Sequence, residues 1–416
     1  MPPPTNNTLN CTPITPQSPF AGLSGDVVFI PGFGGSSLVN LTTNQIVWLT
    51  EQIASGQQTP DIALSISKTF GEGDDIGVAG LVVDNPANPF PTQFVTQLEC
   101  LDQAGQIRLN LFPYDWRRDN VYTGALFLDF LVNIWSANGY KPILVIAHNI
   151  GTQITLQTMA SLGSQNTKIF SGAVFAGGLF HGSVFGLAQQ STGLVVGNNT
   201  KILDYNTMFL MRSAWNFQCS DPNGCIVDAN TNCPITADLY DPQVWLKNNF
   251  SKAFAPNNPS PPGAQDQMTY YLNDVLFLGS IVRDNQSPQS CKYPPMATIC
   301  GGSVSTAAQV KGTQDQTTGK ITVDYTKFVM APGDGVVTYD SCQMVDGFQY
   351  TSFNSSNNHF YLLNDFNVVG QAFSAVGFGS GTALGWGSTS STSSSGSDGN
   401  DDGNGGDGDG GWSSWW

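Results

Sequence analysis

The sequence has little charge, and most of its charges are negative. Only 11% of the 416 residues are Asp, Glu, Lys or Arg, and 15 basic residues stand against 31 acidic ones, which gives a formal net charge of -16. An acidic chain repels the phosphate backbone of DNA and RNA, so this balance disfavours a nucleic acid as partner. The sequence also lacks the roughly 20 uninterrupted apolar residues that a membrane-spanning helix needs. We therefore expect any contact with a membrane to be peripheral.

Histidine is scarce as well, and no Cys-x-x-Cys pair occurs. The three histidines lie far in sequence from the main group of cysteines, which disfavours a zinc site and favours disulfide bonds. We expect no metal and no cofactor. Five of the eight cysteines fall between residues 219 and 300, which predicts that most are paired, chiefly within that segment. The eight are Cys11, Cys100, Cys219, Cys225, Cys233, Cys291, Cys300 and Cys342.

Residues 1–10 lack both the basic start and the apolar run of a secretory signal peptide. Asn-x-Ser/Thr triplets nevertheless recur along the chain, and with the cysteines they favour a secreted or lumenal glycoprotein of the extracellular space or the lysosome. Either a signal peptide has been removed ahead of these residues, or the protein is not secreted, and we favour the first alternative. The triplets begin at Asn6, Asn10, Asn40, Asn198, Asn249, Asn285 and Asn354.

Strand patterns alternate with helical patterns in the first half of the chain. Apolar runs at residues 27–30 and 143–147 predict buried strands, and an apolar-rich stretch over 124–137 predicts a helix between them. A further helix is expected from Thr152, followed by another strand in FSGAVFAGG. Strands and helices in this order predict parallel strands joined by crossovers, which is the pattern of a doubly wound α/β sheet.

Composition divides the chain into four parts. Residues 1–19 are rich in Pro, Thr and Asn and are predicted to form an extended arm. The segments 20–186 and 301–375 carry the strand and helix patterns and are predicted to form the core. Residues 187–300 break that rhythm with Pro, Asn and Cys, as an inserted cap with disulfide bonds would. Residues 376–416 are mostly Gly, Ser, Asp and Asn, which predicts a disordered tail.

The stretch Ala-His-Asn-Ile-Gly at 147–151 has the pattern of a serine hydrolase's nucleophile turn with one difference. Small residues two positions either side of the nucleophile let that strained turn form, but Asn149 stands where the serine belongs. Asp334, in a Gly-Asp-Gly turn, and His359, in a polar loop, follow in the order in which the acid and the base follow the nucleophile. The Pro-Gly-Phe-Gly turn at 31–34 is placed to give a backbone N–H to an oxyanion hole.

The blocks FIPGFGGSSL, LFPYDWRRD, VIAHNIGTQ, AGGLFHGS and APGDGVV occur in this order, followed by a late histidine. In this respect the chain resembles the lecithin:cholesterol acyltransferase family, which includes lysosomal phospholipases. The resemblance spans residues 26 to about 365, and Phe-Pro-Tyr-Asp-Trp-Arg at 112–117 is its most specific block. It implies an α/β-hydrolase with a doubly wound, mostly parallel sheet, an inserted cap and a mobile lid.

Members of that family cleave phospholipid acyl esters or pass the acyl group to an alcohol. The resemblance therefore implies a phospholipid or another acyl lipid as partner, met at a membrane or lipoprotein surface, and no cofactor. Position by position, it assigns the nucleophile's place to Asn149, the acid to Asp334 and the base to His359. It assigns the backbone amides of the oxyanion hole to Phe33 and Ile150.

Two features depart from the family pattern besides Asn149. The family's Ala-Pro-Trp-Gly-Gly is Gly-Leu-Phe-His-Gly at 178–182, and the cysteine pair that often closes a lid soon after the position of Leu38 is missing. We expect His148 to pack beside the nucleophile turn and His181 to fill the space of a smaller residue. Arg117 is expected to be an internal ion-pair partner.

A carboxamide at residue 149 cannot replace a seryl hydroxyl. Its nitrogen lone pair is delocalised, so Asn149 has no route to an acyl-enzyme, and a hydrolase without its nucleophile keeps only about 10³ to 10⁴-fold acceleration over water. We favour a natural pseudoenzyme that binds a lipid or a protein partner. The alternatives are an acyltransferase or phospholipase whose serine was replaced in the laboratory, an active form in which Asn149 has deamidated to aspartate, and an error in the sequence.

Overall fold

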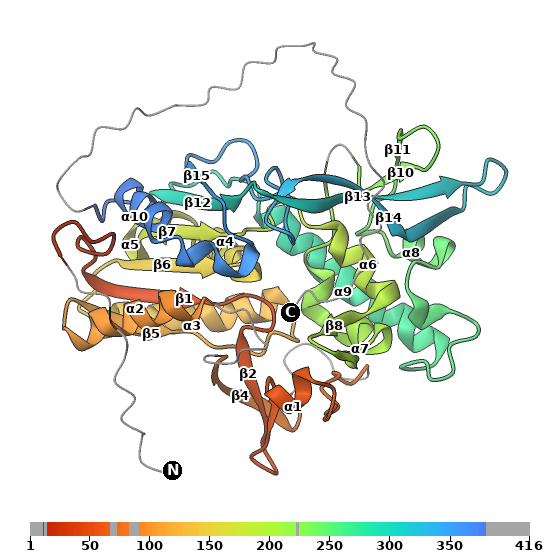
Figure 1. The fold of residues 1–416 in the computed structure, drawn as a ribbon, viewed down its shortest axis with the longest axis horizontal. Helices are drawn as coiled ribbons and strands as arrows, with labels where there is room; N and C mark the ends of the chain where they lie inside the picture. Colours follow the sequence, from red (N-terminus) through yellow and green to blue (C-terminus); the bar gives the residue numbers. More distant parts are fainter. Residues whose placement is uncertain (1–10, 12–14, 67–72, 83–90, 222–223, 380–416) are drawn as a thin grey trace.

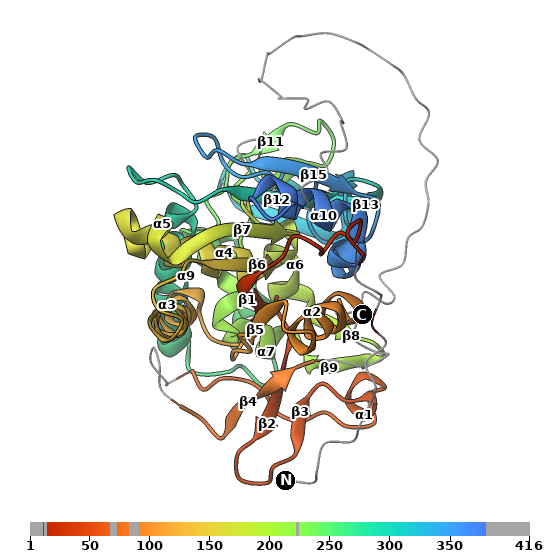
Figure 2. The ribbon, with the colours of Figure 1, turned by 90° about the vertical axis from the view of Figure 1, so that its left-hand side faces the viewer.

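The computed structural model of the chain describes residues 11, 15–66, 73–82, 91–221 and 224–379. The predicted tail lies outside the described residues from residue 380 onward, and so does most of the predicted N-terminal arm. Figures 1 and 2 show the described part from two directions.

A six-stranded sheet forms the centre of the molecule, with the strand order β15-β12-β7-β6-β1-β5 (Figure 2). Every neighbouring pair in this sheet runs parallel, which confirms the predicted doubly wound, mostly parallel sheet. The strands are β1 (Gly25–Ile30), β5 (Ile107–Leu111), β6 (Ile143–His148), β7 (Phe170–Ala176), β12 (Met296–Gly301) and β15 (Thr351–Ser355).

The central strands are buried on both faces because helices cover each side. In β1, Val28 and Ile30 enter one hydrophobic core while Val27 and Phe29 enter the other, as the alternation of side chains along a strand requires. Helices α3 and α4 contribute to the first core, and helices α2 and α10 to the second. Their bounds are α2 (Thr92–Gln103), α3 (Asn120–Ala137), α4 (Ile150–Leu162) and α10 (Phe366–Ala375).

Both predicted helices begin a little earlier than the sequence pattern indicated. Helix α3 begins at Asn120 because Asp119 caps it, accepting a hydrogen bond from the backbone N–H of Tyr122. Helix α4 begins at Ile150, directly after the nucleophile turn. Among the helices that the structure describes, none is long and apolar enough to cross a membrane.

A second region, on the right of Figure 1, has a hydrophobic core of its own. Helix α9 belongs to this region and also packs against α3 and α4 of the central region. Four strands form its sheet in the order β11-β10-β13-β14. The elements are α6 (Val184–Thr192), α7 (Tyr205–Leu210), β10 (Ile226–Asp228), β11 (Pro234–Ile235), α8 (Pro242–Asn248), α9 (Gln265–Asn285), β13 (Val304–Gln314) and β14 (Ile321–Gly333).

The strands near residue 300 divide differently from the predicted boundary between core and cap. Strand β12 lies almost wholly before that boundary, yet it pairs with β7 and β15 in the central sheet. Strands β13 and β14 follow it, but β13 pairs with β10 of the inserted segment. Strand patterns alone do not show which sheet a strand joins, because pairing partners lie far apart in sequence.

The remaining elements lie at the lower edge in Figure 1 or connect the larger ones. A three-stranded sheet has the order β3-β2-β4, and β8 and β9 form a hairpin. The elements are β2 (Ser36–Asn40), β3 (Ile46–Trp48), α1 (Glu51–Ala54), β4 (Ile76–Leu81), α5 (Asn166–Ile169), β8 (Leu194–Val196) and β9 (Asn199–Leu203).

Most of the cysteines are paired, as predicted, but the pairs do not lie chiefly in the inserted segment. The disulfides join Cys11 to Cys100, Cys219 to Cys225 and Cys300 to Cys342, and the second alone lies within residues 187–300. The expectation of pairing within the cap is therefore wrong. Crowding in sequence misleads here because Cys300 lies in strand β12 of the central sheet and its partner is 42 residues away in sequence.

The disulfide pattern predicts the number of accessible thiols in the denatured protein. Cys233 and Cys291 are the two free cysteines, so titration of denatured, unreduced protein should give two thiols per chain. Reduction of the denatured protein should raise the count to eight, since all cysteines then react. Six or more thiols without reduction would contradict these disulfides.

Candidate active site

Asn149 occupies a strained turn between β6 and α4. Its backbone has φ 54° and ψ -127°, a conformation that residues with a side chain rarely adopt. The turn is held between two glycines. A Cβ at Gly151 would lie 2.7 Å from the carbonyl oxygen of Pro31, and a Cβ at Gly32 would collide with that of Asn149. Small residues at both positions therefore let the end of β1 approach the turn.

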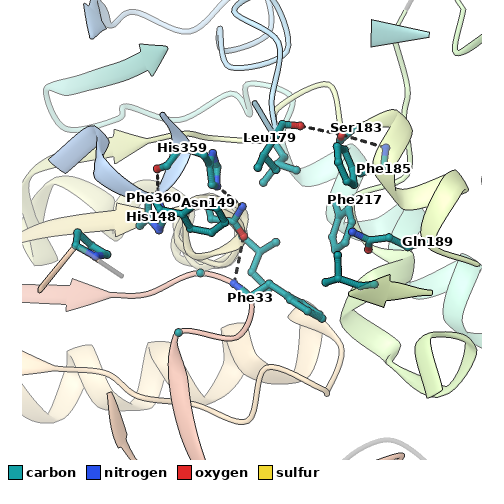
Figure 3. A pocket seen from close by; sticks show the side chains of 16 residues that line it. Phe33, His148, Asn149, Leu179, Ser183, Phe185, Gln189, Phe217, His359 and Phe360 are labelled. Carbon is teal, nitrogen blue, oxygen red and sulfur yellow. Dashed lines mark hydrogen bonds between the residues drawn. The ribbon is translucent and has the colours of Figure 1, made fainter. Parts of the chain in front are cut away.

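The structure brings Asn149, Asp334 and His359 together. Nδ2 of Asn149 lies 2.7 Å from Nε2 of His359 (Figure 3), and Nδ1 of His359 lies 2.7 Å from Oδ2 of Asp334. Asp334 follows β14, and His359 follows β15, so three distant segments meet at this point. The other carboxylate oxygen of Asp334 accepts hydrogen bonds from the backbone N–H groups of Val336 and Val337.

A backbone donor fixes the orientation of the Asn149 carboxamide. The N–H of Phe33 donates to Oδ1 of Asn149 at 3.2 Å (Figure 3). Because an N–H can only donate, the carbonyl oxygen must face Phe33 and the amide nitrogen must face His359. Nε2 of His359 is then the acceptor, and its Nδ1 carries the proton that it donates to Asp334.

The predicted oxyanion-hole residues both lie at the site. The N–H of Phe33 donates to Oδ1 of Asn149. Ile150 is the first residue of α4, and both residues line the pocket beside Asn149. A helix N-terminus carries partial positive charge, so the N-terminus of α4 would stabilise a negative charge that develops at residue 149. Sequence reasoning did not foresee that the side chain at 149 would itself accept the Phe33 hydrogen bond.

A pocket opens beside Asn149, with about 790 Å³ of empty space that includes its opening to solvent. Asp334 and His359 are almost fully buried behind it, whereas Asn149 is partly exposed to it. The pocket lies between the central sheet and the inserted segment (Figure 3), and most of its lining is apolar. The apolar side chains are Phe33, Pro91, Ile150, Leu179, Phe185, Leu194, Phe217, Val336 and Phe360.

Gln189 is the pocket residue that the sequence did not reveal. It lies on α6, is 9% exposed, and its Oε1 has no hydrogen-bond partner among the described residues. A buried acceptor without a partner is costly. Because Gln189 lines the pocket, a turn of its side chain would present this oxygen to a ligand that donates a hydrogen bond. No motif surrounds Gln189, so only its position in space reveals it.

Two of the three residues expected to be structural, Arg117 and His148, have the contacts of that role. Arg117 is fully buried and forms ion pairs with Asp74 and Asp115 at 2.9 and 2.7 Å. Its guanidinium also donates to the carbonyl oxygen of Ile62, so Arg117 joins three segments of the chain. His148 packs against His359, with ring centroids 4.9 Å apart, and its Nε2 donates to the backbone oxygen of His359 at 2.9 Å.

Comparison with known families gives this geometry a context. The lecithin:cholesterol acyltransferase family model matches residues 89–214, a stretch that contains Asn149 and ends before Asp334 and His359. Over these residues the chain is similar to the lecithin:cholesterol acyltransferase family, and its central sheet is that of an α/β-hydrolase fold. Its sequence and its sheet therefore agree on the fold.

Individual relatives are distant. The uncharacterized protein YJR098C of Saccharomyces cerevisiae is 23% identical over 418 residues, which cover 85% of this chain and 62% of that protein. This α/β-hydrolase chain thus spans less than two thirds of that relative's length. A chain in the crystal structure of the Tle4-Tli4 complex is similar with a TM-score of 0.52 and 12% identity, covering 85% of this chain and 98% of that one. The lipase BlEst2 of Bacillus licheniformis, in propeptide form, is 11% identical with a TM-score of 0.32, covering 84% of this chain and 49% of the lipase.

The environment of His148 predicts how stability depends on pH. Burial, and then the nearby His359, lowers the pKa of His148 from 6.5 to about 3. The unfolded chain protonates this histidine below pH 6.5 while the folded protein does not, so the free energy of unfolding falls as pH drops from about 6.5 to about 3. The slope is up to about 1.4 kcal/mol per pH unit.

The variant His148→Gln should flatten this dependence, because glutamine keeps a donor for the carbonyl of His359 but cannot be protonated. Urea unfolding at a series of pH values measures the difference between variant and parent. Carboxylates titrate equally in both proteins, so their contribution to the pH dependence of unfolding cancels in this comparison. Parallel curves for the two proteins would show that His148 is not the residue responsible.

Proposed function

We propose that this α/β-hydrolase binds an acyl lipid in the pocket beside Asn149 and is a catalytically impaired relative of phospholipid acyl hydrolases and acyltransferases. The observation that carries the proposal is the hydrogen-bonded series from Phe33 through Asn149 and His359 to Asp334. In that series a backbone donor, a histidine and an acid have the order of a serine hydrolase site, with Asn149 at the nucleophile's position. The match to the lecithin:cholesterol acyltransferase family supports the lipid class.

The pocket supports an acyl ligand by its chemistry. Its lining is mostly aliphatic and aromatic, which favours burial of a hydrocarbon chain at about 25 cal/mol per Å² of apolar surface removed from water. Gln189 is one of the polar side chains of the lining, and its unpaired oxygen suits a hydroxyl or amide group of the lipid. An ester carbonyl placed near Asn149 would lie at the carboxyl ends of the central strands.

Asn149 impairs catalysis in two ways. The carboxamide lacks a nucleophilic oxygen that His359 could deprotonate. Its own Oδ1 also accepts the hydrogen bond from the N–H of Phe33, which would otherwise be donated to a substrate's oxyanion. Losing one oxyanion-hole donor costs about 10² to 10³ in kcat, beyond the loss of the nucleophile.

The alternative is an active acyltransferase or phospholipase that has serine at this position and was altered at residue 149 alone. The intact positions of Asp334 and His359 favour this alternative equally, because a long-inactive site is free to lose them. Under either alternative, a secreted or lumenal location is supported by the three disulfides. The glycosylation triplets at Asn198, Asn249 and Asn354 begin at exposed residues.

Restoring serine tests the proposal directly. Asn149→Ser should hydrolyse a short-chain aryl ester about 10²-fold or more faster than the parent, because His359 and Asp334 are already placed to activate a hydroxyl. It should also react with a fluorophosphonate probe, which labels activated serines. Phosphatidylcholine vesicles test the lipid substrate in the same preparation.

The matched controls are Asn149→Ala and the double variant Asn149→Ser with His359→Gln, neither of which should be labelled. Rapid turnover by the parent protein would contradict the impaired assignment. An unlabelled Asn149→Ser protein that unfolds at the parent's temperature would show that more than the nucleophile has been lost.

Gln189 gives a separate test of the ligand. Gln189→Leu should weaken binding of a monoacylglycerol with free hydroxyls by roughly 5- to 30-fold. This corresponds to the loss of one hydrogen bond between neutral groups, about 1 to 2 kcal/mol. Binding of the same lipid with its hydroxyls methylated should not weaken, because it donates no hydrogen bond. Fluorescence titration measures both affinities, and equal losses for the two lipids would mean that Gln189 does not contact the hydroxyl.

A further inference from the structure

We propose that this site hydrolyses the side-chain amide of Asn149 itself and thereby converts residue 149 to aspartate. The proposal does not depend on the identity of the lipid. It rests on how the carboxamide is held, because Asn149 is bound by its own site as an amide substrate would be.

The two polar atoms of the carboxamide occupy the two positions that amide hydrolysis requires. Oδ1 accepts a hydrogen bond from the N–H of Phe33, which would stabilise the oxyanion of a tetrahedral intermediate. Nδ2, the leaving group, lies 2.7 Å from Nε2 of His359, which can deliver a proton to it. Cγ between them is therefore polarised in the way that a scissile carbonyl is.

Water has access to this carbon. Asn149 is partly exposed and lines the pocket, so its carboxamide can be reached by solvent. The backbone of Gly32 packs against the carboxamide as well, which keeps it from turning away. His359 is buried and held by Asp334, so its Nε2 stays in place during the reaction.

The reaction balances with water as the one co-reactant. A water molecule attacks Cγ and gives a proton to Nε2 of His359, while the carbonyl electron pair moves onto Oδ1 and is stabilised by Phe33. His359 then passes that proton to Nδ2, the carbonyl re-forms, and the Cγ–Nδ2 bond breaks with its electron pair on nitrogen. The released ammonia takes up the acid proton, so asparagine and water give aspartate and ammonium.

The product is stabilised where it forms. A carboxylate at residue 149 would precede the first turn of the 13-residue helix α4, whose N-terminus favours negative charge. It would keep an oxygen on the N–H of Phe33. Unlike the carboxamide, a carboxylate can act as a nucleophile, so the conversion would supply the site with the group that it lacks.

This route differs from spontaneous deamidation in its product. Spontaneous loss of ammonia proceeds through attack of the next residue's backbone nitrogen on Cγ, and the cyclic imide then opens to a mixture of aspartate and isoaspartate. Ile150 is a poor partner for that attack, because its side chain is β-branched and its backbone is fixed in α4. Hydrolysis by the site gives aspartate alone.

The experiment follows residue 149 by peptide mass spectrometry during incubation of the folded, lipid-free protein at neutral pH. We expect aspartate, without isoaspartate, to accumulate at residue 149. Asn138 is an internal reference, because it precedes Gly139 and so reports spontaneous imide formation in the same sample. His359→Gln should slow conversion at 149 by about 10²-fold or more while Asn138 is unaffected.

Two further measurements guard against a variant that fails to fold. His181→Gln changes a histidine outside the pocket and should convert at the parent's rate. In denaturant the parent protein should lose conversion at Asn149 and retain it at Asn138, since only the first needs the folded site. This arm uses no variant.

Three outcomes would overturn the proposal. They are an Asn149 that stays intact after Asn138 has reacted, isoaspartate at residue 149, and an equal rate in the folded and denatured protein. An intact Asn149 would leave the proposed lipid binding untouched, because lipid affinity is measured separately on the unconverted protein.

Discussion

The close approach of the loop after β1 to the turn between β6 and α4 governs the site. Two missing Cβ atoms permit it, at Gly32 against Asn149 and at Gly151 against the carbonyl of Pro31. The approach brings the N–H of Phe33 onto the Asn149 side chain. A single added methyl group at either glycine would force the two segments apart, and with them the donor from its acceptor.

The N–H of Phe33 determines how Asn149, His359 and Asp334 are hydrogen-bonded. Phe33 determines which end of the carboxamide faces His359, the carboxamide determines which nitrogen of His359 carries the proton, and that proton binds Asp334. Both polar atoms of Asn149 are thereby hydrogen-bonded, so the site bears no unpaired polar atom at this residue.

The sequence predicted the parts of the molecule that depend on local pattern. Strands β1, β6 and β7 and the positions of Asn149, Asp334 and His359 follow from apolar runs and turn motifs of a few residues. The pairing of β13 with β10 and of Cys300 with Cys342 did not follow, because each joins residues that the sequence separates and no local signal encodes the partner. Gln189 was missed for the same reason, since its significance is a missing partner in three dimensions.

The two proposals for the pocket are linked through water. Hydrolysis of the Asn149 carboxamide needs a water molecule at Cγ, and an acyl chain packed among Phe185, Phe217 and the other apolar side chains excludes water from the same space. A bound lipid and the self-hydrolysis of Asn149 therefore compete for one pocket. It follows that residue 149 would remain asparagine for as long as the pocket is filled and would become a carboxylate in chains that have stayed empty. The chemical state of this one side chain would then record whether the protein has held its ligand.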